Sequence, residues 1–390
     1  MQWPISTIDS IKAQTRYSLI GGPFGSNLTT RDYVDDGVPV IRGVNLPDNR
    51  AFHDDDFVYV SDDKADQLSA NLAFSGDLIV TQRGTLGQVG LIPEGCRFKR
   101  YVLSQSQMKL TVDRAVADPL YVYYYFRQPA TVQFIRNHDS SSGVPHINLG
   151  VLKDMRIPMP PLVSQQRIAA TVGGYDDLID NNRRRIQLLE DSVRLLFDEW
   201  FVRLNYPGHA SAAVGPGLPA GWSKLPLEEV LVLQRGFDLP SQDREAGEVP
   251  IYGSTGIVGF HNKAKVPGPG IVTGRSGTLG EVHFIRGDFW PLNTALWVRE
   301  FRRVTPLFAL HLLRGMNLRQ YNGGVSVPTL DRKVVHKAEV LLPPEHTMQA
   351  FEEIASDVRL QIDALSRMID KLRTARDLLL PRLMSGELTV

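Results

Sequence analysis

The 390 residues suggest two or three domains, and the apolar content of 43% with a charged content of 22% is typical of a soluble globular protein. No apolar run approaches the ~18 residues that a membrane span needs, and the N-terminus lacks the regions of a signal peptide, while the single cysteine, Cys96, excludes an internal disulfide and a cysteine-based zinc site. We therefore expect a cytoplasmic protein. Its 43 basic and 43 acidic residues argue against a protein that coats nucleic acid along its length, but they permit a narrow DNA-binding face.

Residues 1–161 are predicted to form a first mixed domain of short strands, turns and helix. The segments 37–46 (GVPVIRGVNL) and 77–92 (DLIVTQRGTLGQVGLI) show β-branched alternation interrupted by glycines. Residues 119–137 have a helical pattern with an aromatic face. We interpret the aromatic run at 121–126 as core rather than as a platform for stacked bases.

Residues 162–204 are predicted to form one long helix with a coiled-coil seam. Apolar residues recur there at alternating steps of four and three. The polar exception, Asn182, has two interpretations: a residue that sets the register, slightly favoured, or a point where the seam opens for a partner subunit. The seam residues are Ile168, Val172, Tyr175, Ile179, Asn182, Ile186, Leu189, Val193, Leu196 and Trp200.

The second half of the chain repeats the first. Residues 205–221, rich in Pro, Gly and Ala, are predicted as a linker, 222–344 as a second mixed domain and 345–386 as a C-terminal helix. The seam recurs 183 residues later, as Ile179 and Ile362 illustrate, and VPHINLGVLKDMRIPMPP (144–161) aligns with VPTLDRKVVHKAEVLLPP (327–344) at the same offset. A shared offset over such a length indicates a duplication.

The two mixed domains share further motifs but differ in length. VPIYG (249–253) matches VPVIRG (38–43), and IVTGRSGTLGEV (271–282) matches IVTQRGTLGQV (79–89) if Ser276 is an extra residue, which pairs Arg83 with Arg275. Between the two motifs the first copy has 40 residues, from Pro39 to Ile79, and the second has 21, from Pro250 to Ile271. We expect one frame with different loops, and hence one task performed on two different targets.

The predicted fold class is α+β, with two mixed α/β domains joined by two long helices that form an antiparallel coiled coil in a pseudo-two-fold internal repeat. The first helix must carry the chain away and the second must return to pair with it. Thirty-six residues of helix, from Ile168 to Arg203, span about 54 Å. That length exceeds the ~34–36 Å of one turn of B-DNA.

Several motifs, in this order and twice over, resemble the specificity (S) subunits of type I restriction–modification systems, the HsdS family. They are GGPFGSNL followed by VPVIRGVNL, RGFDLPSQDREAGEVPIYGSTGIVGFHN followed by GPGIVTGRSGTLGEV, IPMPPLVSQQRIA, and LLLPRLMSGEL. The resemblance covers nearly all of the chain. One departure is PPEHTMQAFEEI, which lacks the Gln-Gln-Arg of residues 165–167, so docking at that end is expected to differ in detail.

The resemblance implies a non-catalytic subunit with two target recognition domains, each of which reads one half of a split sequence in double-stranded DNA. The helices would set the unread gap and dock two methyltransferase subunits, and restriction/translocase subunits would join the complex. S-adenosylmethionine, ATP and Mg would be bound by those partners and no cofactor by this chain. The alternatives are a tandem-domain protein–protein scaffold without a DNA role and the S subunit of a system that has no translocase.

The residues themselves offer little catalytic chemistry. The chain has no Asn/Asp-Pro-Pro-aromatic motif of a DNA methyltransferase and no GxxxxGK[ST] phosphate loop. GGPFGS lacks the strand and helix context of a cofactor loop. A nuclease-like match at Asp48, Asp62 and Lys64 lies in an acidic stretch that we interpret as a solvated loop. The histidines lack HxxxH or HExxH spacing, so no metal site is expected.

Candidate DNA contacts are polar side chains in turns and loops that could reach base edges or phosphates. Because Arg83 and Arg275 are aligned in both copies, we expect them to contact phosphate, whereas residues of the differing loops are better candidates for bases. The candidates are Gln82, Arg83, Thr85, Lys99, Arg100, Ser104, Gln105, Ser141, Ser142 and His146 in the first domain, and His261, Asn262, Lys263, Arg275, Ser276, Thr278 and Asn293 in the second.

Overall fold

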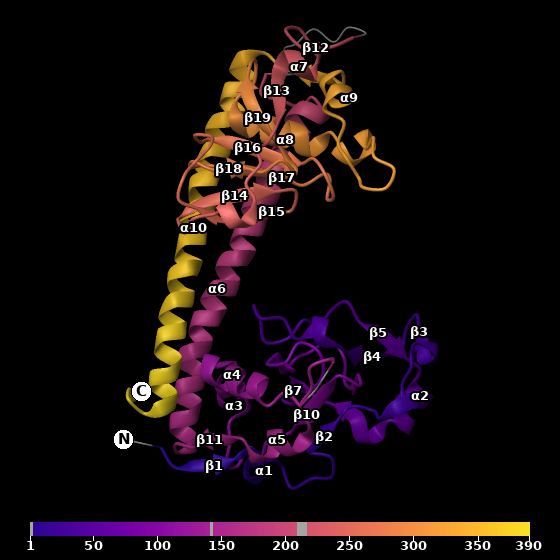
Figure 1. Ribbon diagram of the computed structural model, residues 1–390, viewed down its shortest axis with the longest axis vertical. Helices are drawn as coiled ribbons and strands as arrows, with labels where there is room; N and C mark the ends of the chain where they lie inside the picture. Colours follow the sequence, from indigo (N-terminus) through magenta and orange to yellow (C-terminus); the bar gives the residue numbers. More distant parts are fainter. Residues whose placement is uncertain (1–2, 141–142, 209–216) are drawn as a thin grey trace. The chain divides into compact units, whose positions relative to one another are not determined.

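The structure is a computed structural model that describes residues 3–140, 143–208 and 217–390 (Figure 1). The chain divides into two compact units: the first comprises Met1–Arg183 and Arg367–Val390, and the second comprises Arg184–Ser366. The long helices α6 (Leu162–Phe197) and α10 (Glu345–Ser385) contribute to both units. The predicted linker, 205–221, includes residues 209–216, which lie outside the described residues.

The first unit contains two sheets and a strand pair. Strand β1 (Ile5–Thr7) pairs antiparallel with β11 (Arg156–Pro158). The four-stranded antiparallel sheet has the order β2 (Leu19–Gly21), β10 (Gln107–Leu110), β7 (Leu78–Thr81), β8 (Val89–Leu91). The five-stranded sheet, in which β4 and β9 run parallel, has the order β3 (Tyr33–Val34), β5 (Val58–Val60), β4 (Val38–Ile41), β9 (Tyr101–Leu103), β6 (Leu72–Ala73). Three short helices lie between these strands: α1 (Ile8–Ile11), α2 (Asp62–Gln67) and α5 (Leu149–Asp154).

The helical pattern at 119–137 forms two helices, α3 (Pro119–Arg127) and α4 (Pro129–Asn137), rather than one. Gln128 between them is extended, with φ −63° and ψ 138°, because a following proline disfavours the α-helical conformation. The side chain of Asp118 caps the start of α3 by accepting a hydrogen bond from the Tyr121 amide. Residues 121–126 are buried in the core of the first unit, as predicted.

The second unit repeats the strand order of the first. Strand β12 (Ser223–Pro226) pairs with β20 (Glu339–Leu342). The four-stranded sheet has the order β13 (Leu231–Arg235), β19 (Ala295–Phe301), β16 (Gly270–Gly274), β17 (Val282–Ile285), and the three-stranded sheet has the order β15 (Gly256–His261), β14 (Val249–Gly253), β18 (Trp290–Pro291). The short helices are α7 (Leu227–Val230), α8 (Pro306–Gly315) and α9 (Arg332–His336). Strands β14 and β18 run parallel, as β4 and β9 do. The first unit has β5, α2 and β6 where the second has only β15, which accounts for the shorter second copy.

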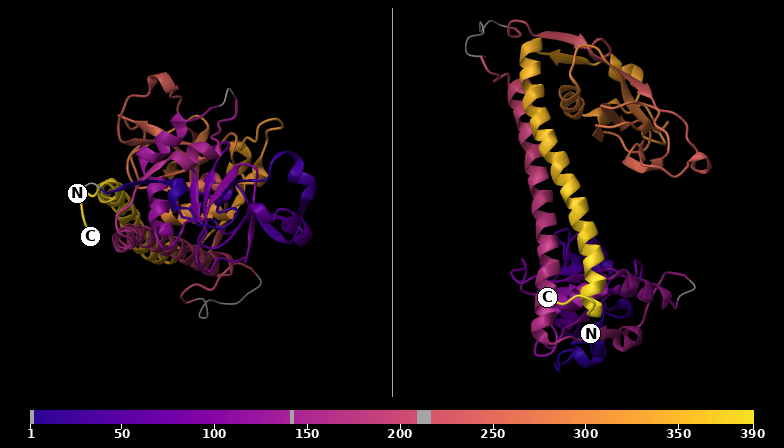
Figure 2. Two further views of the ribbon diagram at one scale, coloured as in Figure 1. Left: turned by 90° about the horizontal axis from the view of Figure 1, so that it is seen from below. Right: turned by 90° about the vertical axis from the view of Figure 1, so that its left-hand side faces the viewer.

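The predicted seam is the contact surface of the two long helices, and every seam position on both is buried or half-buried. In the first unit Ile168 and Val172, near the start of α6, share a core with Leu383, near the end of α10. In the second unit Phe197 of α6 lies against Phe351 of α10, with ring centroids 5.6 Å apart. The helices are therefore antiparallel in each unit and lie side by side in Figures 1 and 2.

Asn182 is buried in this seam. Its side chain is 4% exposed, and its Nδ2 has no hydrogen-bond partner among the described residues. A buried amide without a partner costs stability, which is the property of a polar residue that specifies register. Burial in the seam without a hydrogen-bond partner fits both interpretations of Asn182, which therefore stay predictions.

Candidate nucleic-acid interface

The turn that follows β7 and the turn that follows β16 have the same backbone hydrogen bonds. In the first unit the amides of Gln82 and Arg83 donate to the Ser106 carbonyl at 2.8 and 3.3 Å. In the second unit the amides of Arg275 and Ser276 donate to the Thr294 carbonyl at 2.9 and 3.1 Å. These bonds make Gln82 equivalent to Arg275, and Arg83 equivalent to Ser276.

The strand registers give the same equivalence. Val80 pairs with Met108 in the first unit, and Thr273 pairs with Leu296 in the second. Val80 also pairs with Val89, as Thr273 does with Val282. A single offset, 193 residues from Val80 to Thr273 and from Gln82 to Arg275, therefore relates the two strands and their turns.

The alignment that paired Arg83 with Arg275 is consequently wrong, and Ser276 is not an extra residue. That alignment superposed the Ile-Val-Thr sequences at 79–81 and 271–273, which places the two strands one residue out of the register that they have in the structure. Neighbouring β-branched residues are interchangeable in a buried strand, and register depends on the partner strand. The reason for treating Arg83 and Arg275 as one shared residue is removed, because the equivalent residues differ in both cases.

The second Val-Pro motif of each half, at residues 144–145 and 327–328, holds these turns in place. The Gly84 amide donates to the Pro145 carbonyl at 2.8 Å, and the Gly277 amide donates to the Pro328 carbonyl at 2.9 Å. Both glycines have positive φ, 97° and 90°, a conformation that other residues adopt at a cost. The recurring residues thus build a rigid frame, and the side chains between them project from it.

In the first unit several candidate residues are already engaged within the fold. The side-chain amide of Gln82 donates a hydrogen bond to the Gln105 carbonyl at 2.7 Å, and the side-chain amide of Gln105 donates one to the Leu28 carbonyl at 2.7 Å. Ser104 bonds the side chain of Gln107. Arg100 forms ion pairs with two carboxylates of α2. These side chains hold the loop after β2 and the inserted helix in position.

Other first-unit candidates are presented to solvent. Arg83 and Thr85 are exposed at the turn after β7, and His146 is exposed beside them, its backbone bridged to that of Arg83. Lys99 is exposed in the segment before β9, away from this turn in sequence. Ser141 and Ser142 lie outside the described residues.

In the second unit the candidates separate into two groups. Arg275, Ser276, Thr278 and Asn293 meet at the turn after β16, where the Arg275 guanidinium donates to the Asn293 carbonyl at 3.1 Å and the Asn293 amide bonds Asp238. The other group lies at the end of β15 and just after it. His261 is 4% exposed, and its Nδ1 accepts a hydrogen bond from the backbone amide of Glu245 at 3.1 Å. The Asn262 side chain bonds that of Glu245, and Lys263 is exposed. Only Lys263 of that group extends freely into solvent.

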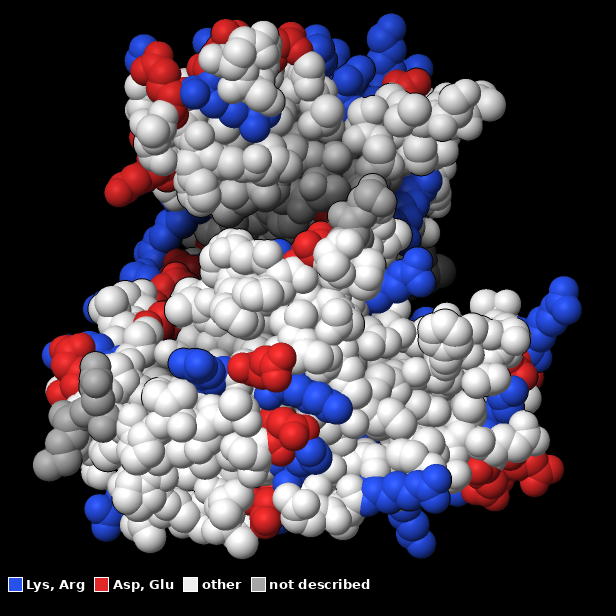
Figure 3. Space-filling view, turned by 60° about the horizontal axis from the view of Figure 1, so that its bottom comes forward, with Lys and Arg blue, Asp and Glu red and all other residues white. Residues whose placement is uncertain are grey.

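Sequence reasoning missed a basic pocket beside Arg275. A cavity of about 450 Å³ is lined there by Arg235, Arg332, Lys333, Asp331 and the turn residue itself, with Leu296 and Leu330 among its walls. The signal in the sequence was the Arg-Lys pair four residues after Val-Pro, which the first copy replaces with Leu-Gly. On the face shown in Figure 3, by contrast, Lys and Arg side chains are mixed with Asp and Glu side chains over a largely uncharged surface.

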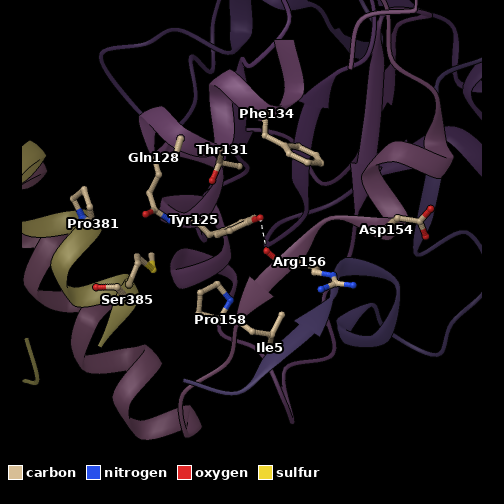
Figure 4. A pocket seen from close by; sticks show the side chains of 12 residues that line it. Ile5, Tyr125, Gln128, Thr131, Phe134, Asp154, Arg156, Pro158, Pro381 and Ser385 are labelled. Carbon is tan, nitrogen blue, oxygen red and sulfur yellow. Dashed lines mark hydrogen bonds between the residues drawn. The ribbon is translucent and has the colours of Figure 1, made fainter. Parts of the chain in front are cut away.

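A second cavity, of about 470 Å³, lies in the first unit where β1, β11, α4 and the end of α10 meet (Figure 4). The Tyr125 hydroxyl donates to the Arg156 carbonyl across it at 2.7 Å. Most of the lining is apolar or neutral, and Ile5 and Phe134 are exposed beside it. This lining suits an apolar protein surface better than a phosphate backbone.

Of the nuclease-like match, Asp48 lies in an exposed turn, as expected, whereas Asp62 and Lys64 do not lie in a loop. Asp62 and Lys64 belong to helix α2, where Asp62 pairs with Arg100 and Lys64 pairs with Asp32 at 2.9 Å. The Lys64 ammonium and the Thr29 amide lower the pKa of Asp32 to about 2. Within residues 3–140, 143–208 and 217–390, no group of three or more His, Cys, Asp or Glu is placed to hold a metal ion. None of the described helices is long and apolar enough to cross a membrane.

Comparison with known proteins assigns both halves of the chain to one kind of domain. The family model of the type I restriction modification DNA specificity domain matches residues 27–191 and again residues 219–371. The type I restriction enzyme MjaIX specificity subunit of Methanocaldococcus jannaschii is 22% identical over 352 residues, 83% of this chain and 80% of that protein. The MjaVIII specificity subunit of the same organism is 25% identical over 140 residues, 35% of this chain and 32% of that protein.

The fold also has a counterpart among solved structures. The crystal structure of a type I restriction-modification system S subunit from M. genitalium covers 98% of this chain and 96% of its own, with 19% identity and a TM-score of 0.59. At this identity the likeness concerns the fold, and it extends over both units and both long helices.

Proposed function

Because the chain belongs to the family of type I restriction–modification DNA specificity subunits, we propose that its two units each read one half of a bipartite site in double-stranded DNA. Each unit would be a target recognition domain, with boundaries near 1–161 and 222–344. The methyltransferase and restriction/translocase subunits would supply the chemistry, together with S-adenosylmethionine, ATP and Mg. This chain would contribute the choice of sequence.

One observation carries the proposal: the same hydrogen-bonded frame occurs twice, with different side chains at equivalent positions. The frame places Gln82 in one unit where the other has Arg275, and Arg83 where the other has Ser276. Arg83 is exposed and suits guanine or phosphate, whereas the serine at the equivalent position is less selective. Two identical frames with different side chains are what an asymmetric split site requires.

The unread gap between the half-sites would be set by the long helices. Helix α6 has 36 residues and α10 has 41, and 36 residues correspond to about 54 Å at 1.5 Å per residue. Neither helix is interrupted where the chain passes from one unit to the other. Each turn inserted into a continuous helix adds a fixed length, so the dependence of the unread gap on helix length can be tested by insertion.

The same helices would dock methyltransferase subunits. Large apolar side chains that do not belong to the seam are exposed along both helices: Val163, Leu178, Leu188, Leu195, Ile354, Leu360, Met368 and Leu378. Apolar side chains repeated along a solvent-facing helix favour a protein interface. The apolar cavity in Figure 4, at the end of α10, is a further candidate contact for such a partner.

The decisive experiment is selection from a pool of random DNA duplexes, with and without a co-expressed methyltransferase subunit. We expect enrichment of two short motifs separated by a constant number of unread base pairs. An unsplit motif would refute the proposal of a split site. No enrichment in either arm would refute the DNA-reading role and favour a protein–protein scaffold.

A second experiment inserts one heptad into each long helix, adding about 10 Å. The insertion should lengthen the gap and leave both half-sites unchanged. If the half-sites themselves changed, the separation of reading from spacing would be wrong.

A further inference from the structure

The basic pocket beside Arg275 is the feature of the second unit that the proposed reading of bases does not use. It is a cavity of about 450 Å³ between the turn after β16, the end of β13 and the start of α9. Four of its lining residues are cationic: Arg235, Arg275, Arg332 and Lys333. Arg275 is half-buried, and the other three residues are exposed.

Two carboxylates lie close by, and both are engaged. Asp238 pairs with Arg235 at 3.2 Å and also bonds the Asn293 amide. Asp331 caps α9 by accepting a hydrogen bond from the Lys333 amide at 2.9 Å. Four cations against these two carboxylates leave the pocket electropositive. His336, on the same short helix, has its pKa lowered by burial and by the positive charge of Arg332, which is consistent with a positive local field.

The first unit has no cation at any of the four equivalent positions. The hydrogen-bond frame relates Arg275 to Gln82, and the amides of Leu330 and Ile147 donate to those two residues in the same way, at 2.8 and 2.9 Å. Asp331 and Asn148 then cap equivalent helices, which relates Arg332 to Leu149 and Lys333 to Gly150. The β13 register places Arg235 opposite Leu296, as Gly21 lies opposite Met108.

We propose that this pocket binds a phosphate group of the DNA backbone, and that the first unit lacks the corresponding contact. The inference rests on the proposed DNA-binding function and adds to it an electrostatic difference between the two halves. The planar Arg guanidinium donates two parallel hydrogen bonds to phosphate oxygens, and Lys adds a compact charge. Phosphate contacts fix the register of a protein on the duplex without reading bases.

The test measures how binding depends on salt. The full chain, with methyltransferase subunits bound if binding requires them, is titrated with a random-sequence duplex and with the selected split-site duplex at roughly 50 to 200 mM salt. The variants are Arg332→Gln, Lys333→Gln and the double variant. The matched control is Lys224→Gln, an exposed lysine of the same unit that lies on β12 and outside the pocket.

Each lost phosphate contact should reduce the slope of log K against log salt by about 0.9. Affinity should fall by the same factor on both duplexes, so the preferred sequence stays unchanged, and Lys224→Gln should match the wild type. A wild-type slope in the double variant would overturn the pocket assignment while leaving the proposed function intact. A changed base preference in one half-site would also overturn it, because these residues would then read bases. If the wild type bound neither duplex, the proposed function itself would fail.

Thermal unfolding of each variant shows that the comparison is made between folded proteins. Arg332 and Lys333 are exposed, and exposed substitutions of this kind usually change stability little.

Discussion

Arg376 of α10 forms an ion pair with Asp176 of α6, and the hydroxyl of Tyr124 donates to the same carboxylate at 2.9 Å. Arg376 is the charged residue in the seam of the second long helix. Burial alone would lower the pKa of Arg376, but hydrogen bonds to Asp176 and Asp377 raise that pKa above its ordinary value. The pair therefore connects α3, α6 and α10 within the first unit.

Replacing Arg376 by Met should destabilise the first unit by about 1–3 kcal/mol, because a half-buried carboxylate loses its cation. Urea unfolding measures the change. Arg373→Met, at an exposed position of α10 three residues before Arg376, serves as control and should stay within ~0.5 kcal/mol. Asp176→Asn combined with Arg376→Met should recover part of the loss. If Arg376→Met were as stable as the wild type, the pair would have no net role.

His311 predicts a pH dependence for the second unit. Its ring is 6% exposed, stacked on Phe197 with centroids 5.6 Å apart. Burial, with the nearby Arg314 and Arg194, lowers the pKa of His311 from 6.5 to about 4. The unfolded chain therefore binds the proton more readily than the folded chain. Stability from the neutral ring is fully present above pH 6.5 and is lost as the pH falls toward 4.

Between pH 7 and pH 5 this histidine should remove about 2 kcal/mol of unfolding free energy. His311→Gln, which cannot titrate, should reduce the pH dependence by that amount, as measured by urea unfolding at both pH values. An unchanged pH dependence in the variant would show that other groups are responsible.

Two equivalent glycines should be intolerant of a side chain. A Cβ on Gly22 would lie 2.0 Å from the Ser104 carbonyl oxygen, and one on Gly236 would lie 2.2 Å from that of Leu292. Because both neighbours are backbone atoms, Gly22→Ala and Gly236→Ala should each cost about 1–3 kcal/mol in chemical unfolding. Gly287→Ala, where a Cβ meets nothing within 4 Å, should be nearly neutral. Equal effects at all three positions would contradict the close approach.

Charge placed on the outer face of α6 should impair partner binding and spare the fold. Leu188 is 63% exposed and Leu195 is 55% exposed, so Leu188→Glu and Leu195→Glu should change unfolding by less than ~0.5 kcal/mol. If methyltransferase subunits dock there, co-purification should fall at least tenfold for the pair of substitutions. Gln187→Glu adds a charge at a neighbouring exposed site and is the matched control. Full co-purification of the double variant would exclude this face as the docking surface.

The sequence by itself determined the repeat and the helical seam. Heptad spacing is a local property, so Ile168, Val172 and Ile179 could be assigned to a buried face before their partners were known. The recurrence of the Val-Pro and Gly-Thr-Leu-Gly motifs likewise predicted two domains of one design and carried part of the resemblance to a known family. The break at Gln128 follows from Pro129, although the helical apolar pattern of residues 119–137 continues across it.

Only the tertiary structure decided which residues are equivalent and which are available. The equivalence of Gln82 with Arg275 follows from hydrogen bonds to Ser106 and Thr294, about 20 residues away in sequence, which directly precede the partner strands β10 and β19. Strand register is set by such partners and not by the sequence of one strand alone. In the same way, Arg100 is held by α2, whereas Arg332 and Lys333 meet Arg275 across more than 50 residues of chain to form the pocket. Contacts between distant segments depend on the closed fold, and no local pattern records them.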